Sequence, residues 1–284
     1  MGNRLHGKTA LITGSTSNIG RGVAIAYGRE GAHVVVSGRN VERGAEVVAE
    51  IRADGGRADF VAADLDGSAA ASRALADETR AVLGGRVDIL VNNAGIFPAN
   101  GTQGTDEDTF DRVFAVNVKA PFFLTAALAP HMTESGGGAV INLGSWAVRQ
   151  GPPLGTAYTA SKGALEALTR AWSAEFGSRG VRVNAISPGV ILIPGPDETT
   201  SNPAEAMMKG TRTAAPAPRT PSARRPSTWP VTSPRSCTAS CSTWTVAAPR
   251  SPSSRADTSH APYSRVSRAP VGTPRGAPAS ASHV

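Results

Sequence analysis

The sequence predicts an α/β fold, a doubly wound parallel sheet, followed by a disordered basic tail rich in Pro, Arg and Ser. Two observations lead to this fold class: short apolar runs alternate with longer segments of helical spacing, and both patterns stop near residue 193. Near-continuous runs of Val, Ile and Leu are typical of strands buried on both faces of a parallel sheet. The runs predict strands at Thr9–Thr13, His33–Ser37, Ala58–Ala62, Val87–Val91, Ala139–Leu143 and Val181–Ile186.

Helices are predicted between these strands, because the intervening segments have helical spacing of apolar residues and sufficient length. Regular alternation of strand and helix predicts that ligands bind at the carboxyl ends of the strands. The predicted helices cover residues 20–30, 41–54, 68–84, 107–133 and 159–178.

The composition changes abruptly after the last predicted strand. Residues 1–193 carry 18 basic and 18 acidic side chains, so the net charge of +7 comes from residues 194–284. Fifteen of the 21 prolines lie from Pro194 onward, and residues 195–284 contain no Leu, Ile or Phe. Such a segment has little apolar surface to offset the entropy of ordering its backbone. We therefore predict a folded domain at 1–193 and a disordered tail at 194–284.

Targeting, membrane and metal signals are weak in this sequence. No apolar stretch precedes the first strand, so we expect no secretory signal, and no apolar window approaches the length of a membrane span. Cys237 and Cys241 alone can build neither a disulfide framework nor a zinc site. These features favour a soluble, cytoplasmic protein with no metal and no membrane partner.

A glycine-rich turn, Thr13–Gly20, joins the first strand to the first helix. Glycines there permit a tight turn and a close approach to a pyrophosphate, which the helix N-terminus attracts. The alternative is an ordinary turn whose glycines serve its conformation only. The candidate cofactor contacts in this turn are Gly14, Ser15, Ser17, Asn18, Ile19 and Gly20.

The end of the second strand indicates which nicotinamide cofactor is preferred. An acidic residue there would bind the ribose 2′-hydroxyl of NAD, whereas an arginine accommodates the 2′-phosphate of NADP. No acid lies between Ser37 and Val41, and Arg39 is well placed. The sequence favours NADP(H), while NAD(H) and a merely solvated arginine stay open.

Tyr158 and Lys162 form a Tyr-x-x-x-Lys pair on one face of a predicted helix. A free tyrosine has a pKa of about 10, too high for proton exchange near neutral pH. A neighbouring ammonium favours the phenolate and lowers this pKa, which makes tyrosine a usable acid and base. The alternative is an exposed pair of little consequence.

Together these segments resemble the single-domain branch of the short-chain dehydrogenase/reductase family. The resemblance runs from about Leu5 to Gly189 and implies a Rossmann-like, NAD(P)-binding domain that acts as a nicotinamide-dependent oxidoreductase. Ser145 precedes Tyr158 by 13 positions, which matches the family's spacing. The remaining matching positions are Asp64, Leu65, Asn92, Asn93, Ala94, Gly95, Asn117, Asn184, Pro188 and Gly189.

The resemblance also implies a role for each matching residue. Tyr158 would exchange a proton with the substrate oxygen, and Ser145 would hydrogen-bond to that oxygen. Lys162 would hold the nicotinamide ribose and lower the Tyr158 pKa, and Asn117 would fix a water that links Lys162 to solvent. Asp64 and Leu65 would meet the adenine; Asn92, Ala94 and Gly95 would line the adenosine side; and Pro188, Gly189 and Ile191 would meet the nicotinamide carboxamide.

The sequence departs from the family at three places. Asn18 stands where a second glycine is usual, but asparagine tolerates left-handed backbone. Ile193 stands where a threonine often helps to hold the carboxamide. After about Pro194 the family's substrate-covering helix and last strand cannot be recognised.

The tail itself suggests a hypothesis for this loss. Read one base earlier, with G or C at free third positions, codons for Cys241–Ala247 encode Val-Leu-Asp-Val-Asp-Gly-Gly, which resembles the family's last strand. We hypothesise a frame-shifted reading of a GC-rich gene, with the shift between about Pro194 and Thr220. A natural basic tail is the alternative. Resequencing the gene distinguishes them, since an intact frame without homology in the shifted frame contradicts the hypothesis.

The resemblance implies an NADP(H)-preferring carbonyl reductase or alcohol dehydrogenase with a small-molecule substrate, such as a 3-oxoacyl thioester, a sugar or a steroid. The alternative is a catalytically impaired dinucleotide-binding protein that lacks the lid and last strand. The turn spacing disfavours a sugar epimerase or dehydratase, and the lack of a metal-ligand cluster disfavours a zinc enzyme. Relatives imply a homo-oligomer, a dimer through the helices at 107–133 and 159–178. The tail has no motif for specific nucleic-acid binding.

Overall fold

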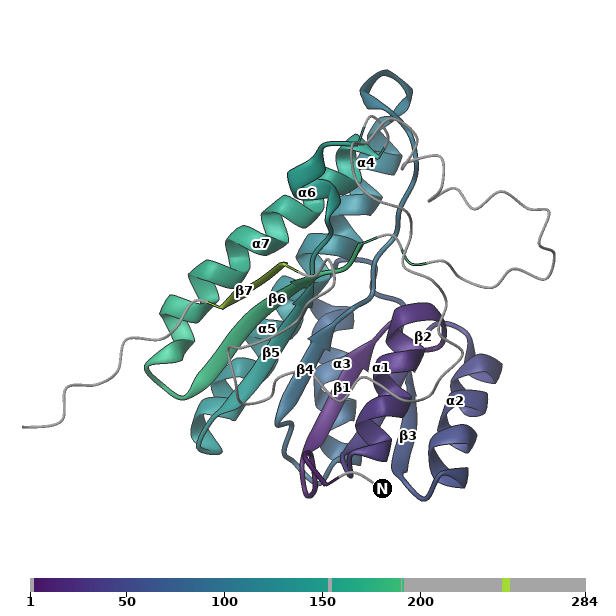
Figure 1. The fold of residues 1–284 in the computed structure, drawn as a ribbon, viewed down its shortest axis with the longest axis vertical. Helices are drawn as coiled ribbons and strands as arrows, with labels where there is room; N and C mark the ends of the chain where they lie inside the picture. The colour runs from purple at the N-terminus through teal and green to yellow at the C-terminus, as the bar shows by residue number, and fades with distance from the viewer. Residues whose placement is uncertain (1–2, 153–154, 190, 192–241, 246–284) are drawn as a thin grey trace, which may run out of the picture. The chain divides into compact units, whose positions relative to one another are not determined.

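The strands of this chain lie side by side in one sheet of order β3-β2-β1-β4-β5-β6-β7 (Figure 1). The computed structural model describes residues 3–152, 155–189, 191 and 242–245. Strands β1 to β6 are parallel, which confirms the predicted doubly wound α/β sheet. The strands are β1 (Thr9–Thr13), β2 (His33–Gly38), β3 (Arg57–Ala62), β4 (Ile89–Asn92), β5 (Gly138–Leu143), β6 (Val181–Ser187) and β7 (Ser242–Thr245).

Helices follow the strands as the sequence predicts. Two short elements, η1 and α6, were not predicted, because three or four residues are too few to show helical periodicity. The helices are α1 (Asn18–Arg29), α2 (Val41–Ala53), α3 (Ala69–Val82), the 3₁₀ turn η1 (Thr102–Gly104), α4 (Glu107–Phe114), the π-helical turn η2 (Ala115–Lys119), α5 (Ala120–Glu134), α6 (Ala147–Gln150) and α7 (Thr156–Gly177).

Alternate residues of the central strands build two separate cores. Leu11, Val35 and Leu90 point to the face covered by α3, α5 and α7. Ile12 and Val36 point to the other face, where α1 and α2 pack. Because a strand turns successive side chains to opposite faces, an uninterrupted apolar run is needed where both faces are covered. This requirement explains why the strand runs carry so few polar residues.

Several helices begin at a side chain that caps their first turn. Asn40 Oδ1 accepts a hydrogen bond from the Arg43 amide at 2.7 Å, which caps α2. Ser68 and Asp106 cap α3 and α4 in the same way. Such caps satisfy amide groups that have no partner within the helix. Each of these helices begins at the residue that follows its cap.

The helix predicted at 107–133 is a continuous helical run of α4, η2 and α5. Within the described residues it is the one helix long and apolar enough to cross a membrane by length and composition, Glu107–Glu134, so the expectation that no window approaches such a length was wrong. Leu124, Leu128 and Met132 of this run are buried in the core. Its apolar character is therefore that of a helix packed inside a domain.

The predicted tail falls almost entirely outside the described residues, and so do the boundary at 193/194 and Ile193. Ser242–Thr245 are the exception, because they pair antiparallel with β6 as strand β7, with Asn184 opposite Thr245. These four residues lie within the predicted tail. Thr, Trp and Thr favour extended backbone, and β6 offers a free edge with which such a segment can pair.

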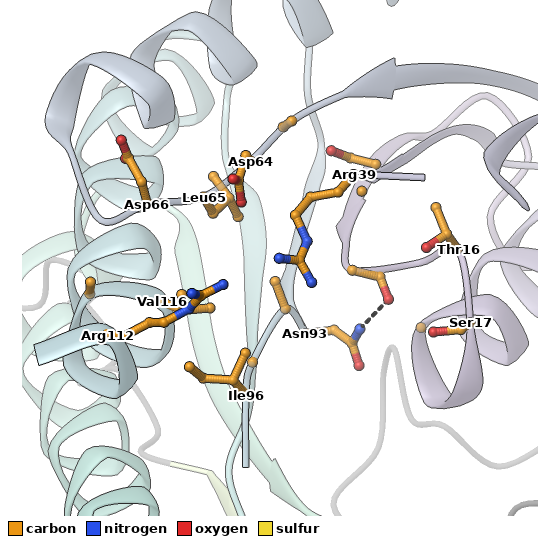
Figure 2. Close-up of a pocket in the computed structure, with 18 of the residues that line it drawn as sticks. Thr16, Ser17, Arg39, Asp64, Leu65, Asp66, Asn93, Ile96, Arg112 and Val116 are labelled. Carbon is orange, nitrogen blue, oxygen red and sulfur yellow. Dashed lines mark hydrogen bonds between the residues drawn. The ribbon is translucent and has the colours of Figure 1, made fainter. Parts of the chain in front are cut away.

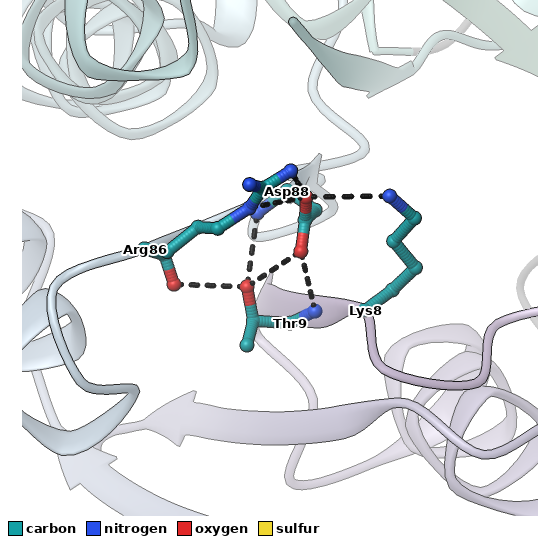
Figure 3. A network of polar contacts seen from close by, with 4 residues as sticks. All are labelled: Lys8, Thr9, Arg86 and Asp88. Carbon is teal, nitrogen blue, oxygen red and sulfur yellow. Dashed lines mark hydrogen bonds and ion pairs between the residues drawn. The ribbon is translucent and has the colours of Figure 1, made fainter. Parts of the chain in front are cut away.

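A buried carboxylate ties β1 to β4 at the amino ends of the strands (Figure 3). Asp88 accepts hydrogen bonds from the amide and hydroxyl of Thr9, at 3.0 and 3.1 Å, and pairs with Arg86 at 2.6 Å and Lys8 at 3.6 Å. Burial raises the pKa of Asp88, but the bonds from Arg86 and Thr9 and the charge of Lys8 outweigh it and lower that pKa. This network lies at the end of the sheet opposite the candidate site, so it serves the fold.

Candidate active site

A pocket of about 900 Å³ opens at the carboxyl ends of β1 to β4 (Figure 2). Its volume is that of sites for cofactors and other small molecules, and its place is where a doubly wound sheet binds ligands. Ten of the predicted cofactor contacts line it: Gly14, Ser17, Asn18, Ile19, Gly20, Arg39, Asp64, Leu65, Ala94 and Gly95.

The first turn of α1 faces this pocket. Ser17, the residue before α1, is extended and makes no side-chain cap to the helix, unlike the capping residues of α2, α3 and α4. The amide groups at the start of α1 therefore have no capping side chain against them. Uncapped amides and the helix dipole together attract phosphate groups.

Two positions of the turn have a backbone that suits glycine or asparagine. A Cβ at Gly20 would collide with Asn93 Nδ2 and the Gly14 carbonyl oxygen. Asn18 has φ of 50°, the one positive value of a non-glycine residue within the described ranges. Its backbone is therefore left-handed, as expected for an asparagine in place of glycine. A pocket shaped by glycine, with free amides at its floor, fits the pyrophosphate of a dinucleotide.

Asn93 connects the turn after β1 with the loop after β4. Its side-chain amide donates to the carbonyl oxygens of Thr13 (2.8 Å) and Gly14 (3.0 Å), and its backbone amide donates to Thr13 Oγ1 (3.1 Å). Figure 2 shows Asn93 at the centre of the pocket wall. Asn93 is one of the positions that match the family, but it was not predicted as a cofactor contact. A polar side chain directly after a buried strand could have indicated it.

Arg39 extends into the pocket from the end of β2, and Thr16 lies across from it (Figure 2). A Cβ at Gly38 would lie 2.8 Å from the Thr16 side chain, so glycine there keeps the turn close to β2. Asp64 and Leu65, after β3, line the same side of the pocket. The Arg39 guanidinium and the Thr16 hydroxyl can together hold an anionic group.

Two predicted cofactor contacts point away from the pocket. Ser15 is fully buried, donates its hydroxyl to the Ile12 carbonyl (2.6 Å) and accepts from the Ser37 amide (3.0 Å), so it joins β1 to β2. Asn92 donates to Asn142 Oδ1 at 2.8 Å in the interior between β4 and β5. Both side chains hold strand ends in place.

Lys162, on α7, lies in the protein interior next to the ring of Tyr158. Its ammonium donates a hydrogen bond to the Leu143 carbonyl at the end of β5 (2.7 Å) and lies 5.7 Å from the Tyr158 ring centroid. Burial lowers the pKa of Lys162 from 10.5 to about 8. A buried amine with one carbonyl partner has lost much of its hydration, which disfavours the charged form.

The surroundings of Tyr158 differ from the sequence-based expectation. We expected Lys162 to lower its pKa, but burial raises the pKa of Tyr158, and the hydrogen bond with Ser145 only partly opposes this. The Lys162 ammonium makes its hydrogen bond to the Leu143 carbonyl and none to the Tyr158 hydroxyl. The phenol of Tyr158 is therefore protonated at neutral pH and suited to donate a proton.

Asn117 lies in η2 and is fully buried. Its side chain accepts from the Ile96 amide (2.9 Å) and donates to the Ile96 carbonyl (3.0 Å) and to Ser161 Oγ (3.0 Å). Ser161 in turn donates to the Tyr158 carbonyl at 2.6 Å. A π-helical turn is often found at a functional site, and this one directs Asn117 between the loop after β4 and α7.

Ser145 lies just beyond β5, in a segment fixed to the end of β6. The amides on either side of it, Gly144 and Trp146, donate to the carbonyls of Ile186 (2.8 Å) and Pro188 (3.2 Å). The candidate residues Pro188 and Gly189 thus lie beside Ser145 rather than in the pocket of Figure 2, and Ile191 is half exposed. The structure thus brings Asn117, Ser145, Tyr158 and Lys162 together.

Sequence reasoning missed several lining residues. Arg112 and Val116 are four residues apart, about one helical turn, and this spacing could have indicated that they share a helix face. The missed residues are Thr16, Ser37, Gly38, Ala63, Asp66, Asn93, Ile96, Asp111, Arg112, Phe114, Ala115, Val116 and Lys119.

Comparison with known proteins identifies a matching family. A model of the short chain dehydrogenase family matches residues 8–203. A sorbitol dehydrogenase of Cereibacter sphaeroides is 41% identical over 189 residues, which cover 66% of this chain and 72% of that protein.

Two solved structures are similar as well. A 7α-hydroxysteroid dehydrogenase with NADH and 7-oxo glycochenodeoxycholic acid is 39% identical, with a TM-score of 0.64 over 66% of this chain and 73% of that one. A metagenomic short-chain oxidoreductase in complex with NADP is 38% identical, with a TM-score of 0.61. The match covers 66% of this chain and 84% of that one.

The buried ammonium of Lys162 predicts a pH-dependent stability. The pKa of Lys162 in the folded state, about 8, lies below the usual 10.5. Below pH 8 the buried charge therefore lowers the free energy of unfolding by its full amount, and this penalty disappears as the pH rises from 8 to 10.5. Relative to Lys162→Met, the wild type should gain about 3 kcal/mol of unfolding free energy over that range. Urea denaturation at a series of pH values measures this. Lys119→Met, at an exposed position, is the control, and parallel wild-type and Lys162→Met profiles would refute the prediction.

Proposed function

Because this chain belongs to the short-chain dehydrogenase family, we propose that it transfers a hydride between a nicotinamide cofactor and a carbonyl compound or secondary alcohol. The family match over residues 8–203 and the dehydrogenases among its relatives make it an oxidoreductase. The observation that supports the reaction best is Tyr158, hydrogen-bonded to Ser145 and adjacent to the buried Lys162.

We propose the following division of work. When bound, the nicotinamide supplies the hydride in reduction and accepts it in oxidation. In reduction, Tyr158 donates its phenolic proton to the substrate oxygen, and the Ser145 hydroxyl hydrogen-bonds to the same oxygen. Lys162, with a pKa of about 8, is mostly charged at neutral pH and opposes the negative charge that Tyr158 acquires. Asn117 keeps the loop after β4 in place against α7.

Replacing the phenol tests this assignment. Tyr158→Phe should lower kcat for ketone reduction by about 10²-fold or more, because the proton donor is lost, while the affinity for NADPH changes less than about twofold. Steady-state oxidation of NADPH with a panel of ketones gives kcat, and calorimetric titration gives the affinity. Tyr27→Phe, at a buried tyrosine of α1, is the matched control. Cofactor binding without turnover of any ketone by the wild type would support the catalytically impaired alternative.

NADP(H) is the cofactor that we propose, with Arg39 and Thr16 around the 2′-phosphate. Both residues line the pocket where β2 ends. A charge-assisted contact between a guanidinium and a phosphate is stronger than a neutral hydrogen bond. Similar solved structures hold NADP in one case and NADH in another, so the relatives leave the preference open.

A cofactor titration decides the preference. The wild type should bind NADPH about tenfold more tightly than NADH, and Arg39→Ala should remove this difference by weakening NADPH alone. Arg43→Ala, an exposed arginine on α2, serves as the control. Equal affinity of the wild type for both cofactors would contradict the assignment of Arg39.

We also propose that the chain forms a dimer through the helices at 107–133 and 159–178. Phe110 on α4 is 45% exposed and Phe122 on α5 is 42% exposed. The ring centroids of Phe122 and Trp172, which lies on α7, are 6.1 Å apart. Exposed aromatic rings on adjacent helices favour burial in an interface. Sedimentation equilibrium tests this, and a monomer at micromolar concentration would contradict it.

A further inference from the structure

Phe97 is an exposed aromatic side chain in direct contact with Tyr158. The two rings meet edge to face, with centroids 4.7 Å apart and planes at 82°. Phe97 nevertheless remains 37% exposed, although large apolar side chains are usually buried. It follows Ile96, which lines the cofactor pocket, so it lies where that pocket meets the catalytic tyrosine.

The backbone on both sides of Phe97 is fixed by hydrogen bonds. Ile96 forms two bonds with the buried Asn117 side chain, at 2.9 and 3.0 Å. Three residues after Phe97, the Asn100 carbonyl accepts from the Gly155 amide (3.1 Å) and the Thr156 amide (3.4 Å) at the start of α7. The backbone that carries Phe97 is therefore fixed, and its ring packs against Tyr158.

Gly155 shows how closely the chain passes this ring. Its φ of 68° favours glycine, and a Cβ there would lie 2.5 Å from Phe97 Cε2. Any larger residue at 155 would push the ring away from its position beside Tyr158. Glycine at this position lets the edge of the Phe97 ring contact the start of α7, while 37% of the residue stays exposed.

From these contacts we propose that Phe97 determines specificity, as the apolar wall of the substrate subsite beside Tyr158. This deepens the proposed function and rests on it. A substrate whose oxygen meets the Tyr158 hydroxyl has its substituents next to this ring. An apolar or cyclic substituent gains contact with the ring. A polyol substituent would lose water there without a hydrogen-bonding partner on the ring. The favoured class is therefore ketones and secondary alcohols with a compact apolar or cyclic group at the reacting carbon.

Ketone binding to the NADP⁺ complex, in which no reduction can occur, tests whether Phe97 contacts the substrate. Cyclohexanone and dihydroxyacetone are each titrated into the chain loaded with NADP⁺, and ligand NMR gives the dissociation constants. The wild type should bind cyclohexanone more tightly than dihydroxyacetone, and Phe97→Ala should weaken cyclohexanone about tenfold, as expected for lost apolar contact in a pocket. Dihydroxyacetone binding should change less than twofold. Phe97→Leu keeps apolar volume and should retain most of the affinity.

The controls separate this inference from the proposed function. Val82→Ala removes an exposed apolar side chain from α3, outside the site, and should leave both dissociation constants unchanged. Tighter binding of dihydroxyacetone, no ketone binding to the NADP⁺ complex, or a Phe97→Ala variant with unchanged cyclohexanone affinity would each overturn the inference. The proposed function fails separately if the wild type binds ketones but does not reduce them with NADPH, or if Tyr158→Phe reduces them as fast as the wild type.

Discussion

Strands β1 and β4 run parallel side by side, and the chain leaves them towards opposite faces of the sheet. After β1 it enters α1, which packs in one core, and after β4 it reaches α5, which packs in the other. Because the two connections diverge, a crevice stays open at the carboxyl ends of these strands. The turn before α1 forms one side of the crevice, and the segment Asn93–Gly95 forms the other. The cofactor pocket lies in this crevice.

Side-chain hydrogen bonds keep the two sides of the crevice at a constant distance. Thr13 Oγ1 accepts from the amides of Asn93 and Ala94, at 3.1 and 3.0 Å. Asn117 satisfies both backbone groups of Ile96 on the next loop. A buried backbone group without a partner is costly, so these loops cannot shift without losing several bonds at once. The site is therefore built before a ligand enters it, which reduces the ordering needed on binding.

The electrostatics of the centre come from burial more than from pairs of charges. Burial lowers the pKa of Lys162 and raises that of Tyr158, so each group is shifted towards its neutral form. Phe97 adds an apolar surface on the same tyrosine. A neutral phenol beside an aromatic ring suits proton donation to a substrate with apolar substituents, and it connects the proposed chemistry with the proposed specificity.

The sequence by itself determined the fold class and most of the strands, because a strand covered on both faces needs an uninterrupted apolar run. Helical spacing put Tyr158 and Lys162 on one helix face, and the family resemblance added Ser145 and Asn117 to them. The sequence also indicated that Asn18 can replace a glycine because asparagine tolerates left-handed backbone, and its φ is 50°.

Only the tertiary structure decided which way the remaining side chains point. Ser15 and Asn92 are adjacent to pocket residues in sequence but turn into the interior, because neighbouring strands offer them partners. Burial sets the direction of the Tyr158 pKa shift, and the Lys162 ammonium donates to the carbonyl of Leu143, 19 residues away in the chain. The contact of Phe97 with Tyr158 likewise joins two distant segments. Such contacts have no local sequence pattern, since they arise only when separate strands end at the same edge of a sheet.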